Sequence, residues 1–460
     1  MVLNMPFEVI HLGGERCVTG SCHFLRANGL NMLVDCGAVQ GEDQAVPVDA
    51  WPVKPSQIDF VFISHAHIDH IGRLPELIEN GFKGEIITTH PTKALLLPML
   101  KDAMALSGLS KEGAGSIAGR IDKLSWGFEY NQEFDLKKGI RFTFHQAGHI
   151  LGSSFLLLES DSPRWSVLFS GDLGMRNTPL LPDPDPPPSC DLLILESTYG
   201  DRLHETREHR IEQLGRILTR AFSDGGKVFI PAFALGRTQE LLYELDRLFS
   251  DTSFRNQFPQ LTEKSSIPVV LDSPLGVELT KITSSLSEYW DQEAKALLNH
   301  GDHPIDFERL YTVANHQDHL KLLERPGPLL VIAGSGMCTG GRIVNHHKAG
   351  IEDPKNDILF VGYNARGTPG REIQQCASTP GGHVMLDGER YQVRAGVHLL
   401  GGYSAHADQK ELIEWVKLMP EKPQIIKLVH GEPSAQEALA NKLNHHGYES
   451  VISCRPPAES

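Results

Sequence analysis

The sequence predicts a two-domain α/β protein in which an inserted α/β domain interrupts a β-rich one. Three observations predict this class: the chain has 460 residues, its composition is that of a folded protein, and its strand-like and helix-like stretches change rhythm along the chain. A single core rarely organises a chain of this length, so we expect two domains or one domain with a large insertion. Hydrophobic residues make up 40% and charged residues 22%, which excludes a fibrous or disordered protein.

The first part of the chain, residues 1–205, is rich in short strands that end in polar or glycine clusters. We expect these strands at 31–34, 60–63, 85–87, 166–169 and 192–195. From 206 to 382, helical patterns alternate with buried strands, which predicts a parallel sheet with crossover helices. We expect the strands of this sheet at 227–230, 268–271, 328–332 and 358–361.

Short strands return after the helical segment, at 383–386 and 425–429, and a helix from Pro433 follows them. We therefore predict that residues 383–460 complete the first domain, and that residues 206–382 form the inserted domain. The first domain would then be discontinuous in sequence.

Charge and terminal composition narrow the class of protein. A formal charge of −15 argues against a protein that holds nucleic acid by bulk electrostatics, although bound divalent cations would attract a polyanion locally. No stretch is long and apolar enough for a membrane span, and the N-terminal residues lack the pattern of a secretory signal, so we expect a cytoplasmic protein with no membrane partner. The seven cysteines form no C-x-x-C pair and are expected to be ordinary buried thiols.

A run of potential metal ligands follows the strand expected at 60–63. His65, His67, Asp69 and His70 lie within six residues, where an apolar strand passes into a turn. A turn allows neighbours along the chain to point into one pocket, and imidazole with carboxylate is a ligand set for zinc or manganese. The alternative is an accidental histidine-rich loop. The spacing favours a metal site.

Further candidate ligands follow other expected strands: His149, Asp172 and His430. Each has a glycine neighbour, which we interpret as room for the backbone to approach an ion. Asp35 could orient a ligand imidazole from behind. Taken singly, each of these residues could also be a turn aspartate or a buried core histidine.

These motifs resemble the metallo-β-lactamase superfamily, because Asp35, the H-x-H-x-D-H run, His149 and Asp172 occur in the order found there. The resemblance implies an αββα sandwich with two zinc ions at one edge, manganese being the alternative metal. By position, one zinc would be bound by His65, His67 and His149, the other by Asp69 and His70, and Asp172 would bridge them.

The rest of the chain is similar to the β-CASP nucleases, the group that includes the cleavage and polyadenylation endonuclease subunit and RNase J. The later motifs of that group look like Glu196, His406 and His430 here, and the segments 231–240, 334–337 and 362–371 also match. The DNA-repair branch carries an apolar residue in place of His430, so the resemblance favours single-stranded RNA as the substrate. Unlike RNase J, the chain ends soon after its last helix, which speaks against 5′-exonuclease activity.

These observations predict a zinc-dependent ribonuclease that cuts RNA internally by a two-metal hydroxide mechanism. In that mechanism Asp69 serves as a ligand of the catalytic centre, His406 protonates the leaving oxygen, and Glu196 keeps His406 charged. The expected products carry 5′-phosphate and 3′-hydroxyl ends. We expect the substrate phosphates to contact Ser404, Ser335, Gly336, Arg237, Arg342, Arg366 and Arg371.

The sequence also leaves other functions open. A small-molecule metallohydrolase, such as a thioesterase or lactonase, could be built on the same sandwich, and a 5′-exoribonuclease or a non-catalytic scaffold are further alternatives. A homodimer is also left open. The remaining histidine-rich segments, 300–303, 315–319 and 345–347, are expected to be surface or interdomain groups rather than metal ligands.

Overall fold

The structure is a computed structural model that describes residues 5–41, 43–204, 209–262, 267–362, 364, 366–401 and 403–452. The chain forms two compact units. Unit 1 contains Met1–Leu203 and Ala405–Ser460, and unit 2 contains His204–Ser404. The predicted α/β class is confirmed, and the β-rich part of the chain is discontinuous in sequence.

Unit 1 contains two mixed sheets. The first has the order β1-β2-β3-β4-β5-β6, formed by β1 (Phe7–Gly13), β2 (Cys22–Ala27), β3 (Leu30–Val34), β4 (Phe60–Phe62), β5 (Glu85–Thr89) and β6 (Ser125–Phe128). The second has the order β21-β20-β11-β10-β9-β8-β7, formed by β7 (Glu133–Asp135), β8 (Ile140–Gln146), β9 (Ser154–Asp161), β10 (Arg164–Phe169), β11 (Leu192–Glu196), β20 (Ile425–Val429) and β21 (Ser450–Ile452). The last strands of the chain thus join a sheet that the first half of the chain begins.

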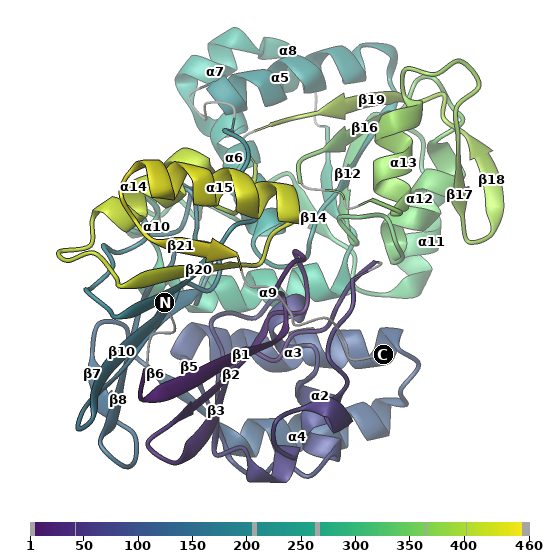
Figure 1. The fold of residues 1–460 in the computed structure, drawn as a ribbon. Helices are drawn as coiled ribbons and strands as arrows, with labels where there is room; N and C mark the ends of the chain where they lie inside the picture. The colour runs from purple at the N-terminus through teal and green to yellow at the C-terminus, as the bar shows by residue number, and fades with distance from the viewer. Residues whose placement is uncertain are drawn as a thin grey trace. The chain divides into compact units, whose positions relative to one another are not determined.

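The two sheets of unit 1 pack face to face, with helices on their outer faces. In β8, Ile140, Phe142 and Phe144 alternate with more exposed residues and enter the core between the sheets, where Phe62 of the first sheet meets them. Figure 1 shows α14 and α15, in yellow, over β20 on the outer side of the second sheet. The helices of unit 1 are α1 (Ile68–Ile71), α2 (Leu74–Glu79), α3 (His90–Leu106), α4 (Lys111–Leu124), α14 (Gln409–Lys417) and α15 (Pro433–His445). This is the predicted αββα sandwich.

Unit 2 is built on a parallel sheet with the order β14-β13-β15-β12-β16-β19. Its strands are β12 (Lys227–Pro231), β13 (Val269–Leu271), β14 (Leu310–Thr312), β15 (Leu329–Ala333), β16 (Asp357–Phe360) and β19 (Gly396–Leu399), and β17 (His383–Leu386) with β18 (Glu389–Gln392) forms a separate hairpin. Its helices are α5 (Arg210–Ala221), α6 (Arg237–Ser250), α7 (Thr252–Gln257), α8 (Pro259–Thr262), α9 (Pro274–Ser285), α10 (Gln292–Asn299), α11 (His316–Glu324), α12 (Arg342–Gly350) and α13 (Pro369–Cys376). Every residue of β15 is buried, as expected for a strand covered on both faces.

The second boundary between the compact units differs from the predicted one. The first predicted boundary, between 205 and 206, lies outside the described residues. The second was predicted at 382–383, whereas unit 2 continues to Ser404. The reason is that β19 pairs in parallel with β16, and Val384 and Leu386 of β17 join the core of unit 2. A strand pattern alone does not tell which sheet the strand joins.

The cysteines are only partly as predicted. Cys22, Cys36, Cys190 and Cys338 are buried free thiols, but Cys17 and Cys376 are half-buried. Cys454 lies outside the described residues.

Candidate metal centre

The predicted ligands of unit 1 converge from the ends of its strands. His65 follows β4, His149 follows β8, and Asp172 follows β10. His430 follows β20, and Asp69 and His70 lie in α1, which begins directly after His67. Because strands of the two packed sheets end at one edge, residues far apart in sequence meet there. All seven predicted ligands fall into two adjoining groups.

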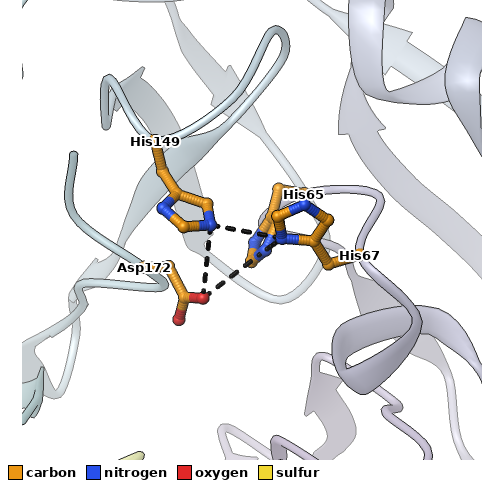
Figure 2. Close-up of side chains that lie close together, drawn as sticks. All are labelled: His65, His67, His149 and Asp172. Atoms are coloured by element: carbon orange, nitrogen blue, oxygen red, sulfur yellow. Dashed lines mark hydrogen bonds and ion pairs between the residues drawn. The ribbon is translucent and has the colours of Figure 1, made fainter. Parts of the chain in front are cut away.

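The first group contains His65, His67, His149 and Asp172, and Figure 2 shows their side chains pointing toward one another. Nδ1 of His67 lies 3.1 Å from Nε2 of His65 and 3.2 Å from Nε2 of His149. Oδ2 of Asp172 lies 3.6 Å from Nε2 of each of the other two imidazoles, those of His65 and His149. Four ligands placed tetrahedrally about 2.1 Å from one ion would lie about 3.4 Å apart. These separations fit a single cation.

The second group contains Asp69, His70 and His430. Nε2 of His430 lies 3.2 Å from Nε2 of His70 and 3.6 Å from Oδ2 of Asp69. Oδ2 of Asp69 lies 3.9 Å from Nε2 of His70. The second group is therefore slightly more open than the first.

Asp172 faces both groups. Its Oδ2 is turned to the first group, while its Oδ1 lies 3.3 Å from Nε2 of His70 and 3.6 Å from Nδ1 of His430. The residue is 2% exposed, and Oδ1 has no hydrogen-bond partner among the described residues. A buried carboxylate oxygen without a partner is costly, and a cation on that side would satisfy it. The donor set and this oxygen fit a metal.

Residues behind the ligands fix the orientation of their rings. Asp35 accepts a hydrogen bond from the backbone N–H of Ser64 at 2.8 Å, and its Oδ2 lies 2.7 Å from Nδ1 of His70. If Nδ1 of His70 donates to this carboxylate, Nε2 is left as the free lone pair. On the other side, Oγ1 of Thr198 lies 3.0 Å from Nδ1 of His430, which leaves Nε2 of His430 for the same task. The predicted position of Asp35 behind a ligand imidazole matches the geometry.

Ser64 and Thr198 were missed from the sequence, although both are next to recognised motifs. Oγ of Ser64 donates to Oδ2 of Asp35 at 2.9 Å and lies 3.0 Å from Nδ1 of His65. Ser64 directly precedes His65, and Thr198 stands two residues after Glu196. A hydroxyl residue within two positions of a predicted site residue is the signal that could have identified them.

Burial and neighbouring charges set the protonation states of the site. Burial lowers the pKa of His65 and His149 well below the ordinary value, and that of His67 to about 4. Burial would raise the pKa of Asp172, but the surrounding histidines hold it well below its usual range. Neutral imidazoles at His65, His67 and His149 beside an ionised Asp172 are the forms in which these residues bind metal. Burial would also lower the pKa of His70, but the carboxylates of Asp172 and Asp35 outweigh burial and raise it well above the ordinary value.

His406 and Glu196 adjoin the first group. Nδ1 of His406 lies 3.2 Å from both carboxylate oxygens of Glu196, and its Nε2 lies 3.8 Å from Oδ2 of Asp172. Glu196 is fully buried and also accepts the backbone N–H of Leu173 at 2.7 Å. Burial lowers the pKa of His406, but Glu196 and Asp172 outweigh burial and raise it to about 9. An imidazole held charged beside a metal centre can donate a proton.

Strained backbone positions occur at two of these residues. Asp35 has φ of 60° and His430 has φ of 51°, in the left-handed region that non-glycine residues seldom adopt. Such positions cost roughly 1–3 kcal/mol each and persist where the surrounding structure fixes them. Both lie at the turn after a strand, where the strain aims a polar side chain into the site.

Two glycines flank Asp172, Gly171 directly before it and Gly174 two residues after it, and both are packed closely against other segments. A Cβ atom on Gly171 would lie 2.8 Å from Cβ of Ser64. A Cβ atom on Gly174 would lie 1.9 Å from the carbonyl oxygen of Gly148. Gly174 therefore allows the loop that carries Asp172 to pack against the loop that carries His149. It provides room for neighbouring backbone, and the role predicted for the glycines next to an ion stays a prediction.

The predicted substrate-contact residues lie in unit 2, in several environments. Ser335 and Ser404 are half-buried, Gly336 is buried, Arg366 is exposed and Arg371 is half-buried on α13. Arg237 and Arg342 were expected to line a cleft, but Arg237 is buried and pairs with Glu240, and Nη1 of Arg342 lies 2.7 Å from Oδ1 of Asp272. The buried guanidinium group of Arg237 needs a carboxylate partner, and the half-buried group of Arg342 satisfies the fully buried carboxylate of Asp272.

The other histidine-rich segments are not all at the surface, so that prediction was partly wrong. His300 and His316 are exposed, but His319, His346 and His347 are buried in unit 2. His319 and His346 both contact Asp272. A buried carboxylate partner, which the local sequence does not reveal, makes their burial favourable.

Three protein-family patterns match this chain. The metallo-β-lactamase superfamily matches residues 16–232, the Beta-Casp domain matches 238–373, and the Zn-dependent metallo-hydrolase RNA specificity domain matches 390–453. Among the described residues, the helices are all too short or too polar to cross a membrane.

Several known proteins are similar over most of the chain. A ribonuclease from Thermus thermophilus is 37% identical over 97% of this chain and 98% of its own length. Transcription termination factor FttA of Methanocaldococcus jannaschii is 33% identical over 93% of this chain and 67% of its own length. The cleavage and polyadenylation specificity factor 73 of Drosophila melanogaster is 31% identical over 97% of this chain and 63% of its own length. A crystal structure of a protein of unknown function from Enterococcus faecalis shares the fold, with a TM-score of 0.53 at 14% identity, covering 97% of this chain and 98% of that one.

Proposed function

This chain belongs to the β-CASP nucleases of the metallo-β-lactamase superfamily, and we propose that it is a metal-dependent ribonuclease that cuts single-stranded RNA internally. The products would carry 5′-phosphate and 3′-hydroxyl ends. The main support for the proposal is the position of Asp172, because its two carboxylate oxygens face two separate groups of candidate ligands. That arrangement suits a pair of divalent cations, zinc or manganese, sharing one carboxylate.

The residues that would hold the two cations form two groups, and each group faces a different carboxylate oxygen of Asp172. His65, His67 and His149 would hold the first cation and Asp69, His70 and His430 the second. When bound, a pair of divalent ions activates water as the nucleophile and offsets negative charge on the phosphate oxygens. Asp35, Ser64 and Thr198 hold three of the imidazoles in the ring orientation and tautomer that this requires.

His406 would act as the general acid. The charged imidazole donates Nδ1–H to Glu196 and carries its second proton on Nε2, the nitrogen on the side of Asp172. Cleavage of the bond between phosphorus and the 3′-oxygen produces an alkoxide, which takes up that proton and leaves as the 3′-hydroxyl. The carboxylate of Glu196 stabilises the charged imidazole. The phosphate remains on the fragment on the 3′ side of the cut, as its 5′-phosphate.

The negative charge of the protein is compatible with an anionic substrate at this site. The chain carries a formal charge of −15, so bulk electrostatics would repel RNA. Cations held in a buried site attract negative charge only over a short range. They therefore favour a substrate phosphate at the metal site over RNA bound elsewhere on the protein surface. Exposed Arg366, half-buried Arg371 and the hydroxyl groups of Ser335 and Ser404 are proposed as further phosphate contacts on unit 2.

A circular single-stranded RNA tests both the position of the cut and the product ends. An endonuclease opens the circle, whereas a 5′-exonuclease finds no end on which to act. RNA ligase recloses the linear product only if it carries a 5′-phosphate and a 3′-hydroxyl. We expect the zinc-loaded protein to open the circle and ligase to restore it, with His406→Ala inactive. An intact circle beside degraded linear RNA would point to the exonuclease, and hydrolysis of a thioester or lactone with RNA untouched would overturn the proposal.

A further inference from the structure

A buried aspartate in unit 2 gathers three side chains around its carboxylate. Asp272 directly follows β13 and is 0% exposed. Its Oδ2 lies 2.6 Å from Nδ1 of His319 and 2.6 Å from Nε2 of His346, while its Oδ1 accepts from Nη1 of Arg342 at 2.7 Å. We call Asp272, His319, Arg342 and His346 the Asp272 hub.

The hub is held by hydrogen bonds and not by a metal. Its nitrogen–oxygen distances of 2.6 Å are those of charge-assisted hydrogen bonds, whereas the ligands facing Asp172 stand 3.3–3.6 Å from its oxygens. Nε2 of His319 lies 3.0 Å from Nδ2 of Asn345, so that nitrogen accepts and Nδ1 carries the hydrogen. A cation would also have to sit beside the guanidinium group of Arg342, which the charges oppose.

The hub joins segments that follow different strands of the parallel sheet. Arg342 begins α12 and donates to the carbonyl oxygens of Val313 at 2.7 Å and Ala314 at 3.0 Å, both of which follow β14. His319 lies on α11 and His346 on α12. All of these segments lie at the carboxyl ends of strands, which is the edge where open parallel sheets bind ligands.

The loop 334–341, between β15 and α12, depends on the position of α12. The backbone N–H of Ile343 in α12 donates to the carbonyl oxygen of Gly334 at 3.0 Å, and the N–H of Ser335 donates to that of Gly340 at 3.1 Å. Within the described part of the chain, the backbone N–H groups of Gly336 and Met337 find no acceptor. A closed glycine-rich loop with unused amide donors is a suitable cradle for phosphate.

We propose that the Asp272 hub fixes the loop 334–341 in the conformation that binds an RNA phosphate. The hub members are then positioning residues of an RNA-binding surface on unit 2, because they act through the loop and do not touch the substrate. This inference rests on the proposed RNA substrate, and it adds the side chains that prepare unit 2 to recognise RNA.

The neighbouring histidines His346 and His347 supply a matched pair for the test. Both are buried on α12, at 2% and 0% exposure, but among the described residues neither ring nitrogen of His347 has a hydrogen-bond partner. His346→Leu removes one donor from Asp272, and His346→Gln restores an N–H near the position of Nε2. His347→Leu removes a buried imidazole of the same size without touching the hub.

The experiment measures binding of a fluorescent single-stranded RNA to zinc-loaded full-length protein, with His406→Ala in every variant so that the RNA stays intact. We expect His346→Leu to weaken RNA binding by about tenfold or more, since a buried charge-assisted hydrogen bond is lost. His346→Gln should recover most of the affinity, and His347→Leu should bind like the parent. Recovery by glutamine would not be expected of a general packing effect.

Three results would overturn the inference: unchanged binding by His346→Leu, equal weakening by His347→Leu, or no recovery in His346→Gln. The proposed function fails separately. If the parent binds RNA and the hub variants respond as expected, but protein with an intact His406 leaves RNA uncut, then the ribonuclease proposal is wrong and the hub stands. If the parent binds no RNA, both are wrong.

Discussion

Replacing Glu196 by glutamine should shift the pH at which the enzyme loses its general acid. Glutamine keeps the size of the side chain but removes the charge that lies 3.2 Å from Nδ1 of His406. Burial would lower the pKa of His406, yet Glu196 and Asp172 raise it from 6.5 to about 9. This increase corresponds to about 3 kcal/mol in favour of the charged imidazole.

The magnitude of the effect follows from the contribution of each carboxylate. Glu196 is the strongest of the interactions that raise the pKa of His406, so without its charge we expect the pKa to return to about 6.5 or below. At pH 8 an imidazole with a pKa of about 9 is about 90% protonated, and one with a pKa of about 6.5 is about 3% protonated. The acid form is lost as the pH rises through the pKa. Cleavage by Glu196→Gln should therefore fall about thirtyfold at pH 8 and less than about twofold at pH 6.

The assay is single-turnover cleavage of RNA across about pH 5.5 to 9.5, with Glu196→Asp as the control that keeps the charge. Bound cations would lower both pKa values, so the displacement between the two profiles is the quantity to compare. If Glu196→Gln loses activity equally at every pH, or keeps the profile of the wild type, then Glu196 does not control the proton of His406.

Three further predictions concern metal binding and packing. Chelation should abolish RNA cleavage and lower the unfolding temperature by about 5 °C, because the cations bind only the folded site. Calorimetry with and without EDTA measures this shift. Equal unfolding temperatures in the two samples would speak against a bound metal. Asp35→Asn should weaken zinc affinity about 10- to 100-fold, because Nδ1 of His70 loses its charged acceptor. A competition titration with a zinc chelator measures this affinity. If the variant binds zinc as tightly as the wild type, then Asp35 does not support metal binding by His70. Gly174→Ala should destabilise the protein by about 2 kcal/mol or more, because its Cβ would meet Gly148 at 1.9 Å. As a control, Gly119→Ala in α4, where a Cβ atom meets nothing within 4 Å, should stabilise the protein by about 0.5–1 kcal/mol. Urea denaturation measures the stability of both variants. If Gly174→Ala were the more stable of the two, this packing would be wrong.

The convergence of the candidate ligands could be predicted largely from the sequence because its signals are local. A strand that passes into the run His65–His70 shows its ligands within one turn of chain. His149, Asp172 and His430 each follow a recognisable strand, and strand ends meet at an edge of a sheet. The partnership of His406 with Glu196, which is 210 residues away, came only from the resemblance to a family.

Other features could not be predicted because they depend on tertiary partners. The hairpin of β17 and β18 shows a strand pattern, but its pattern does not reveal that Val384 packs into unit 2. His319 and His346 were expected at surface or interdomain positions because histidine is often exposed, whereas their burial within unit 2 depends on a hydrogen bond to Asp272 from another segment. Local sequence gives the type of a side chain, but not the carboxylate that it will meet.

Anomalous X-ray scattering at the zinc absorption edge, from crystals grown with zinc, tests the two-cation site most directly. We expect two peaks on either side of Asp172, one among His65, His67 and His149 and the other among Asp69, His70 and His430. A single peak, or a second zinc held by residues outside these two groups, would contradict this expectation.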